Sequence, residues 1–124
     1  MMTGVQRFED LVAWQKARTL TGEIYRLTGQ GMLARDHGLK NQMQRAAVSV
    51  MSNIAEGFER RSRRDFRHFL VIAKASSAEL RSQLYVALDA GLIGQSQFDA
   101  VTTQAIEVSR VLSGLHRSIR PDSE

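Results

Sequence analysis

Apolar residues recur every three or four positions along four segments of this chain. This period places the apolar side chains on one face of an α-helix. The segments predict helices at residues 8–28, 39–56, 63–90 and 96–117. No segment shows the alternation of apolar and polar residues that is typical of a strand. The single proline, Pro121, follows the last segment, so the helices can run without interruption.

These four segments predict an all-α protein in one domain that spans residues 1–124, since the length suits one domain. Short connections make sequential helices antiparallel, and the expected fold is an up-down-up-down four-helix bundle. The last segment supports this fold because its apolar residues form a heptad seam, the pattern of helices that cross at about +20°. The seam consists of Phe98, Val101, Ala105, Val108, Leu112, Leu115 and Ile119.

The segment at residues 39–56 carries a polar stripe beside its apolar one. The stripe consists of Gln42, Arg45, Ser49, Asn53 and Glu56. Asn53 and Glu56 could form part of a ligand site. We prefer hydrogen bonds within the bundle or across a subunit contact, because buried polar groups must be paired. Arg45 and Arg60 are the candidate partners of Glu56.

Local signals predict where the helices begin and end. Gly57 is expected to end the second helix, since glycine adopts the left-handed conformation without a Cβ penalty. Ser62 and Asp65 fit a capping box that starts the third helix, and Ser96 is the expected cap of the fourth. Small residues at positions 75–78 would let another helix approach closely. Trp14 could be an aromatic ligand platform, but we prefer a place in the core or an interface.

Positive charge is concentrated in one region of the chain. The net charge is +4; residues 60–81 carry seven basic and two acidic side chains, whereas residues 1–59 carry a net +1 and residues 82–124 a net −2. Five arginines lie close together: Arg60, Arg61, Arg63, Arg64 and Arg67. They could simply keep a loop solvated. Two features favour anion binding: arginine suits bidentate phosphate contact, and the cluster lies at a predicted helix N-terminus.

The sequence gives no support for an enzyme or a metal site. There is no cysteine, so disulfides and thiolate chemistry are excluded. His37, His68 and His116 have no histidine or carboxylate three or four positions after them, as a metal site in a bundle would need. Phosphate-binding and dinucleotide-binding glycine motifs are missing. We therefore predict no catalytic residues, no metal and no cofactor. The lack of a leader or a long apolar run leads us to expect a soluble, cytoplasmic protein without a membrane partner.

Three segments resemble the four-helix-bundle family encoded by intervening sequences of bacterial 23S ribosomal RNA genes. The first is Asp10–Ala17 (DLVAWQKA) with Ile24 and Tyr25, and the second is Gly38–Gly57, notably RAAVS and SNIAEG. The third runs from Arg60-Arg61-Ser62 through Phe66, Phe69-Leu70 and Ala78-Glu79-Leu80 to Gln83-Leu84. The resemblance covers about residues 8–115. It implies a homo-oligomer, most simply a homopentamer. The chain is also similar to the accessory protein of diversity-generating retroelements, which binds nucleic acid and a reverse transcriptase.

These observations predict a non-enzymatic, homo-oligomeric bundle that binds nucleic acid, RNA in particular. Arg60, Arg61, Arg63, Arg64 and Arg67 are expected to contact phosphates, with Arg45 as a secondary candidate. Nothing in the cluster reads base identity, so binding should be driven by the backbone and sensitive to salt. The alternative is a protein-interaction scaffold, or an accessory subunit that recruits a protein partner such as a reverse transcriptase.

Overall fold

The computed structural model describes residues 4–121 of the chain, and within that range it is all-helical. The four α-helices are α1 (Val12–Thr28), α2 (His37–Glu59), α3 (Arg63–Asp89) and α4 (Gln95–Ser118). Two short 3₁₀ turns, η1 (Phe8–Asp10) and η2 (Leu33–Arg35), precede α1 and α2. The predicted fold class is confirmed.

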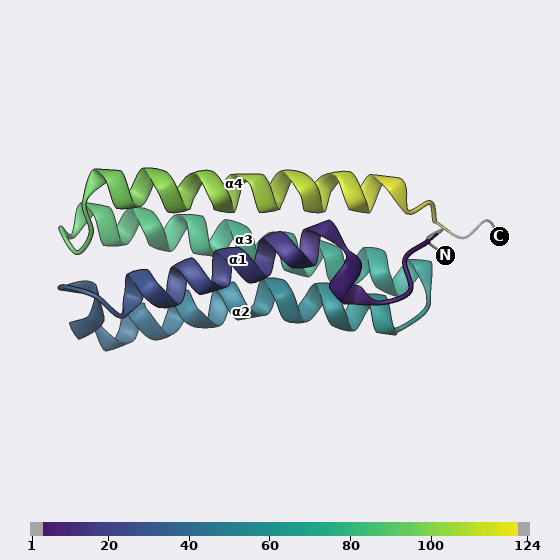
Figure 1. The fold of residues 1–124 in the computed structure, drawn as a ribbon, viewed down its shortest axis with the longest axis horizontal. Coiled ribbons are helices and arrows are strands. Elements are labelled where there is room, and N and C mark those ends of the chain that lie inside the picture. Colours follow the sequence, from purple (N-terminus) through teal and green to yellow (C-terminus); the bar gives the residue numbers. More distant parts are fainter. Residues whose placement is uncertain (1–3, 122–124) are drawn as a thin grey trace.

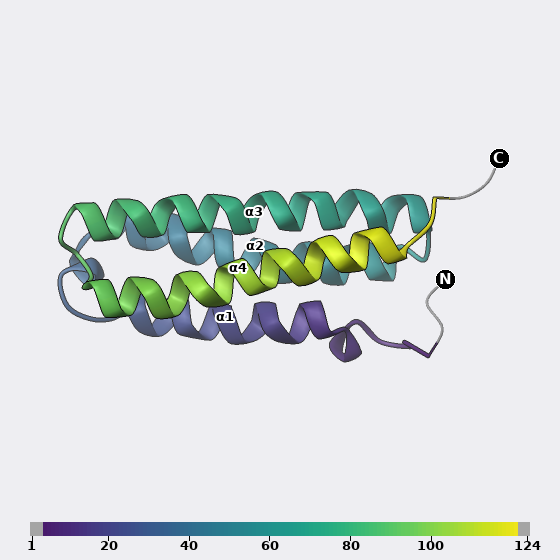
Figure 2. The same ribbon diagram turned by 90° about the horizontal axis from the view of Figure 1, so that it is seen from above.

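The helices form an elongated antiparallel bundle (Figures 1 and 2). Helix α1 packs against α2 and α4, and α3 packs against the same two helices from the other side. The α2–α3 turn lies at the same end of the bundle as residues 4 and 121. The α1–α2 and α3–α4 connections lie at the opposite end, which we call the far end.

The core follows the apolar stripes that the sequence pattern predicted. All seven residues of the α4 seam contact the core, and Leu115 is the one that is only partly buried. Phe58 and Phe66 fill the core near the α2–α3 turn, with their rings 5.8 Å apart in an edge-to-face arrangement. The other large buried side chains are mostly aliphatic: Leu20, Ile24, Leu33, Met43, Val50, Ile54, Leu70, Leu80, Leu84 and Leu112.

The first helix begins later than predicted. The chain makes η1, then extends at Leu11 (φ −73°, ψ 128°) before α1 starts at Val12. Leu11 is buried in the core, and the Phe8 ring packs edge-on against Trp14 at 5.2 Å. This packing holds residues 8–10 apart from the helix although their apolar spacing continues the helical period. Trp14 lies partly buried against the core, as we preferred.

The predicted ends of the second helix, residues 39 and 56, are both wrong. Helix α2 begins at His37 because the Asp36 side chain accepts a hydrogen bond from the Leu39 backbone N–H at 3.0 Å. It continues to Glu59, and Gly57 lies buried inside its last turn instead of ending it. A Cβ atom at Gly57 would come within 2.6 Å of the Phe69 Cβ. Glycine at this position therefore permits close contact between α2 and α3.

The predicted cap of α3 is confirmed, and the predicted cap of α4 is wrong. The Ser62 Oγ accepts from the Asp65 backbone N–H at 3.2 Å, so α3 starts where predicted. Ser96 does not cap α4, which begins one residue earlier with Gly94 at the cap position. There the Gln97 Oε1 accepts from the Gly94 backbone N–H at 2.8 Å. This contact satisfies the backbone donor of the cap residue itself.

Small residues in the middle of α3 bring three helices together, as predicted. Ser77 is fully buried, and its hydroxyl lies 2.8 Å from the Ser109 hydroxyl on α4. The neighbouring Ser76 hydroxyl lies 2.8 Å from the Ser49 hydroxyl on α2. These contacts pair hydroxyl groups that would otherwise be unsatisfied where the backbones approach.

Candidate nucleic-acid interface

Two segments that are distant in sequence meet where the start of α3, which follows the α2–α3 turn, lies beside the end of α4 (Figures 1 and 2). Together their arginines form a surface that we call the basic end: Arg60, Arg61, Arg63, Arg64, Arg67, Arg117 and Arg120. The sequence cluster comprised the first five. Arg117 and Arg120 were missed because they lie about 50 residues further along. The antiparallel topology was the available signal, since it places the end of α4 beside the start of α3.

Arg60 is engaged with acidic neighbours. Its guanidinium lies 3.1 Å from Glu56 and 4.0 Å from Asp65, and it also sits 5.0 Å from the centre of the Phe69 ring. The predicted Glu56–Arg60 partnership is confirmed. All three charged side chains are about half exposed, so the ion pairs contribute little stability. Their main effect is to reduce the positive charge that Arg60 adds to the basic end.

Arg61 occupies a backbone conformation that usually belongs to glycine. Its φ of +60° is in the left-handed region, directly after the cap residue of α2. A residue with a Cβ atom pays about 1–2 kcal/mol there. The guanidinium lies 5.3 Å from the centre of the Phe58 ring, and the residue is exposed. Backbone strain of this kind often accompanies a functional site.

Arg63 and Arg64 are exposed in the first turn of α3. The partial positive charge of a helix N-terminus attracts anions, so their guanidinium groups and the helix dipole act in the same direction. Asp65 in the same turn offsets part of this field. Arg61, Arg63 and Arg64 therefore form an exposed positive part of the basic end.

Arg67 has a structural task. Its Nη1 donates hydrogen bonds to the backbone carbonyls of His116, at 2.9 Å, and Ile119. Helix C-termini leave carbonyls unsatisfied, and here an arginine from α3 supplies the donors for α4. The guanidinium is partly buried in this role, so Arg67 holds the two segments of the basic end together. The sequence placed it among the phosphate contacts without indicating this task.

The positive charges of the basic end affect the pKa of His116. Burial lowers the pKa of this imidazole, and the positive charges of Arg67, Lys74 and Arg117 lower it further. His116 is therefore held in the neutral form at neutral pH. A bound anion would oppose the effect of these cations and make protonation easier.

The polar stripe of α2 divides between bonded and exposed residues. The Asn53 Nδ2 donates to the Ser49 carbonyl at 2.8 Å and to the Ser49 hydroxyl at 3.0 Å, so these two residues bond within the bundle, as preferred. Gln42 and Arg45 are exposed. Arg45 lies between two shallow hollows near the middle of α2, about four helical turns before Arg60. The structure therefore does not bring Arg45 to the basic end.

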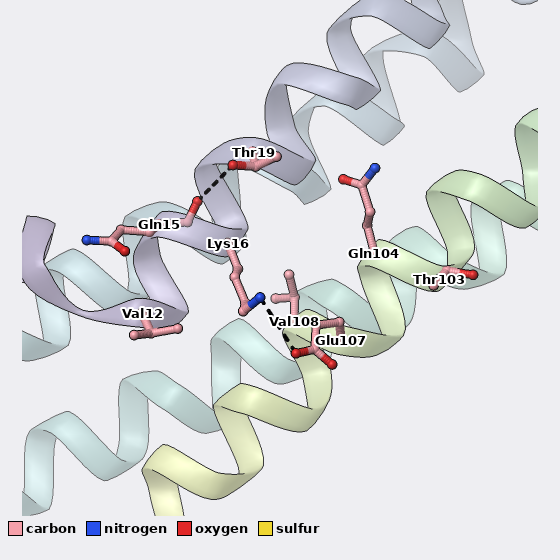
Figure 3. Close-up of a pocket in the computed structure, with 8 residues that line it drawn as sticks. All are labelled: Val12, Gln15, Lys16, Thr19, Thr103, Gln104, Glu107 and Val108. Atoms are coloured by element: carbon pink, nitrogen blue, oxygen red, sulfur yellow. Dashed lines mark hydrogen bonds and ion pairs between the residues drawn. The ribbon is translucent and has the colours of Figure 1, made fainter.

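A groove of about 490 Å³ between α1 and α4 is the other notable hollow (Figure 3). Lys16 reaches across it from α1, and its Nζ lies 3.7 Å from the Glu107 Oε2 on α4. Arg110 also donates a hydrogen bond to the Glu107 carboxylate, and this bond lowers the pKa of Glu107. A carboxylate with a lowered pKa is a weaker proton acceptor, and Lys16 partly neutralises its charge. The groove thus lacks an activated base.

The three histidines lie on different elements, at the start of α2, in α3 and near the end of α4. Between residues 4 and 121, no three side chains of histidine or acidic type come together as a metal site would require. Within the same range, no helix is both long enough and apolar enough to cross a membrane.

Comparison with known families tests the family membership that the sequence suggested. Residues 9–114 match the model of the 23S rRNA-intervening sequence protein family. The chain belongs to this family. No curated protein matches the chain. The relation to the accessory protein of diversity-generating retroelements stays a prediction.

A solved structure has the same fold as this 23S rRNA-intervening sequence protein. It is the crystal structure of a protein of unknown function from the S23 ribosomal protein family of Bacteroides thetaiotaomicron. The two chains are 22% identical and superpose with a TM-score of 0.78, covering 86% of this chain and 96% of the other. At this identity the likeness supports the bundle fold alone.

Proposed function

We propose that this protein binds RNA through the basic end and catalyses no reaction. The observation that carries the proposal is the meeting of the start of α3 with the end of α4, joined by Arg67. The meeting concentrates arginines at one end of the bundle, where Arg61, Arg63 and Arg64 are exposed. RNA is the preferred ligand because the family takes its name from a ribosomal RNA.

Phosphate contact follows from the chemistry of the exposed arginines. A guanidinium offers parallel N–H donors that match two phosphate oxygens, so each arginine can hold one phosphate in a defined orientation. Each such contact releases condensed counterions, which makes the affinity fall as salt concentration rises. Phosphate contacts position a protein on a nucleic acid but do not read its sequence. The proposed interaction therefore depends on the shape and charge of the RNA.

The nonenzymatic part of the proposal is supported by the α1–α4 groove. Catalytic sites commonly shift the pKa of a base toward the working pH. Here the pKa of Glu107 is shifted in the opposite direction by Arg110 and Lys16. The two charged groups that line the groove thus bind each other instead of activating a nucleophile.

A binding titration tests the proposed function directly. We expect the full chain to raise the fluorescence anisotropy of a labelled single-stranded RNA in a saturable way at about 50 mM salt, where phosphate contacts are strongest. Heparin, a polyanion without bases, should compete for the same surface. If the RNA stays unbound at this salt concentration, the proposed function is wrong.

Two substitutions at Arg61 separate its backbone from its side chain. Arg61→Gly and Arg61→Ala remove the same guanidinium, so both should weaken RNA binding by roughly 4-fold near 0.15 M salt. The glycine variant should be more stable than the alanine variant by about 1 kcal/mol, because only glycine adopts φ +60° without strain. Urea denaturation and RNA titration of both variants measure the two effects. Equal stability would show that the backbone at this position is not strained.

The alternative function, a scaffold for protein partners, is favoured by the outer face of α3. Exposed small and apolar residues lie along this face: Val71, Ala75, Ala78, Ser82 and Val86. Their spacing of three and four residues matches a surface that another helix can cover. A second copy of the chain is the occupant that the predicted homo-oligomer supplies. The homopentamer and a reverse transcriptase partner remain predictions.

A further inference from the structure

A hollow of about 320 Å³ lies between α3 and α4 beside the basic end. Its apolar side chains are Leu70, Val71 and Leu112, and its polar ones are Lys74, Ser113, His116 and Arg117. Among residues 4–121, no acidic side chain lines it. We call it the α3–α4 pocket. Its size is at the lower limit of the about 300–1,000 Å³ that is usual for small-molecule sites.

Few nearby groups neutralise the positive charges of the Lys74 and Arg117 side chains at the pocket. The C-terminal end of a helix carries a partial negative charge, which would normally attract Lys74 and Arg117. Arg67 already donates to the carbonyls of His116 and Ile119 at this end of α4. The groups that act on the His116 imidazole by their charge are Arg67, Lys74 and Arg117, and all three are positive. The pocket therefore presents a net positive rim beside the exposed Val71 side chain, and the buried Leu70 and Leu112 close its floor.

We propose that the α3–α4 pocket receives one unstacked nucleotide of a single-stranded RNA. The base packs against the exposed Val71 side chain, above the buried Leu70 and Leu112, and Lys74 and Arg117 hold the adjoining phosphate. Imidazole and guanidinium planes also stack on bases, which suits His116 and Arg117 at the rim. The Ser113 hydroxyl supplies a hydrogen-bonding group to the base or ribose. This inference rests on the proposed function and adds a contact that the arginines of the α2–α3 turn do not provide.

The composition of the pocket argues for a nucleotide instead of a simple anion. An inorganic phosphate would satisfy the cations but leave the exposed Val71 side chain in water. An uncharged apolar ligand would leave Lys74 and Arg117 without a partner. A nucleotide combines a flat, weakly polar base with a phosphate, so it matches both parts. The pocket also opens beside the basic end, where the proposed RNA backbone already lies.

The experiment compares two polymers of equal length and charge. One is a single-stranded RNA, and the other is a ribose-phosphate chain that lacks bases. We expect the unmodified protein to bind the RNA roughly 10-fold more tightly, because a stacked base adds to phosphate binding. Ser113→Leu, which fills the pocket without changing its charge, should remove this preference. Ser52→Leu is the matched control, since Ser52 is an exposed serine within α2 and does not line the pocket.

The outcomes separate this inference from the proposed function. If the unmodified protein binds both polymers equally, the pocket does not receive a base, and the proposed function stands. This comparison needs no variant, so it holds even if Ser113→Leu misfolds. If neither polymer binds, the proposed function itself is overturned. A second readout is the NMR signal of the His116 imidazole, which uridine monophosphate should shift in the unmodified protein but not in Ser113→Leu. An unchanged His116 signal in the unmodified protein would also overturn the pocket assignment.

Discussion

Replacing Arg61, Arg63 and Arg64 together by alanine should weaken RNA binding by roughly 50-fold near 0.15 M salt. Each phosphate contact on a single strand contributes about 0.7 to the slope of log affinity against log salt concentration, so the slope should fall by about 2. The fold itself should persist, because none of the three side chains belongs to the buried core. Titrations at two or more salt concentrations measure both quantities.

A charge-matched control makes this prediction specific to the basic end. Arg26, Arg35 and Arg81 lie toward the far end of the bundle, and their replacement by alanine removes the same net charge. We expect this triple variant to keep nearly all of its RNA affinity. If the two triple variants lose affinity equally, general attraction by a positive protein explains the binding, and the basic end has no special role.

Gly57→Ala should lower the free energy of unfolding by about 1–3 kcal/mol. In an exposed helix, exchanging glycine for alanine normally stabilises by up to about 1 kcal/mol. Here the added Cβ atom would lie 2.6 Å from the Phe69 Cβ and 3.2 Å from the Phe66 ring. The Phe69 Cβ is fixed to its backbone, so α2 and α3 must move apart to accommodate the methyl group. Guanidinium denaturation with an unchanged m-value would measure this cost.

Gly22→Ala is the matched control for this substitution. Gly22 also lies inside a helix, but among residues 4–121 the nearest side-chain atom to its added Cβ is the Arg26 Nη2, at an ordinary contact distance of 3.8 Å. We expect Gly22→Ala to stabilise the protein by about 0.5–1 kcal/mol, opposite in sign to Gly57→Ala. If Gly57→Ala also stabilises the protein, helix propensity dominates, and the close α2–α3 contact matters less than its geometry indicates.

The spacing of the apolar residues predicted the fold because the apolar face of each helix can be recognised from its own segment. The seam from Phe98 to Ile119 needed no knowledge of its partners to be recognised. The helix ends were harder to predict because tertiary contacts decide them. Gly57 has the sequence signature of a helix stop, yet the close approach of Phe69 is what requires glycine there. The residue with left-handed backbone after α2 is instead Arg61, and an arginine gives no sequence signal for this conformation.

The candidate site was predicted in part for a similar reason. A run of arginines is visible in any sequence, whereas contacts between distant segments are not. The distance of Arg67 from the carbonyls of α4 depends on how α3 and α4 align, and this alignment decides that Arg67 joins two helices. The same alignment adds Arg117 to the basic end and creates the α3–α4 pocket.

The position of residues 4 and 121 has a practical consequence for fusion proteins. Both lie at the end of the bundle that holds the α2–α3 turn (Figures 1 and 2). A purification tag or fluorescent protein fused at either terminus would therefore emerge beside the arginines and crowd them. The α1–α2 connection offers a better attachment point, because Gly31 has open space around it and lies at the opposite end of the molecule.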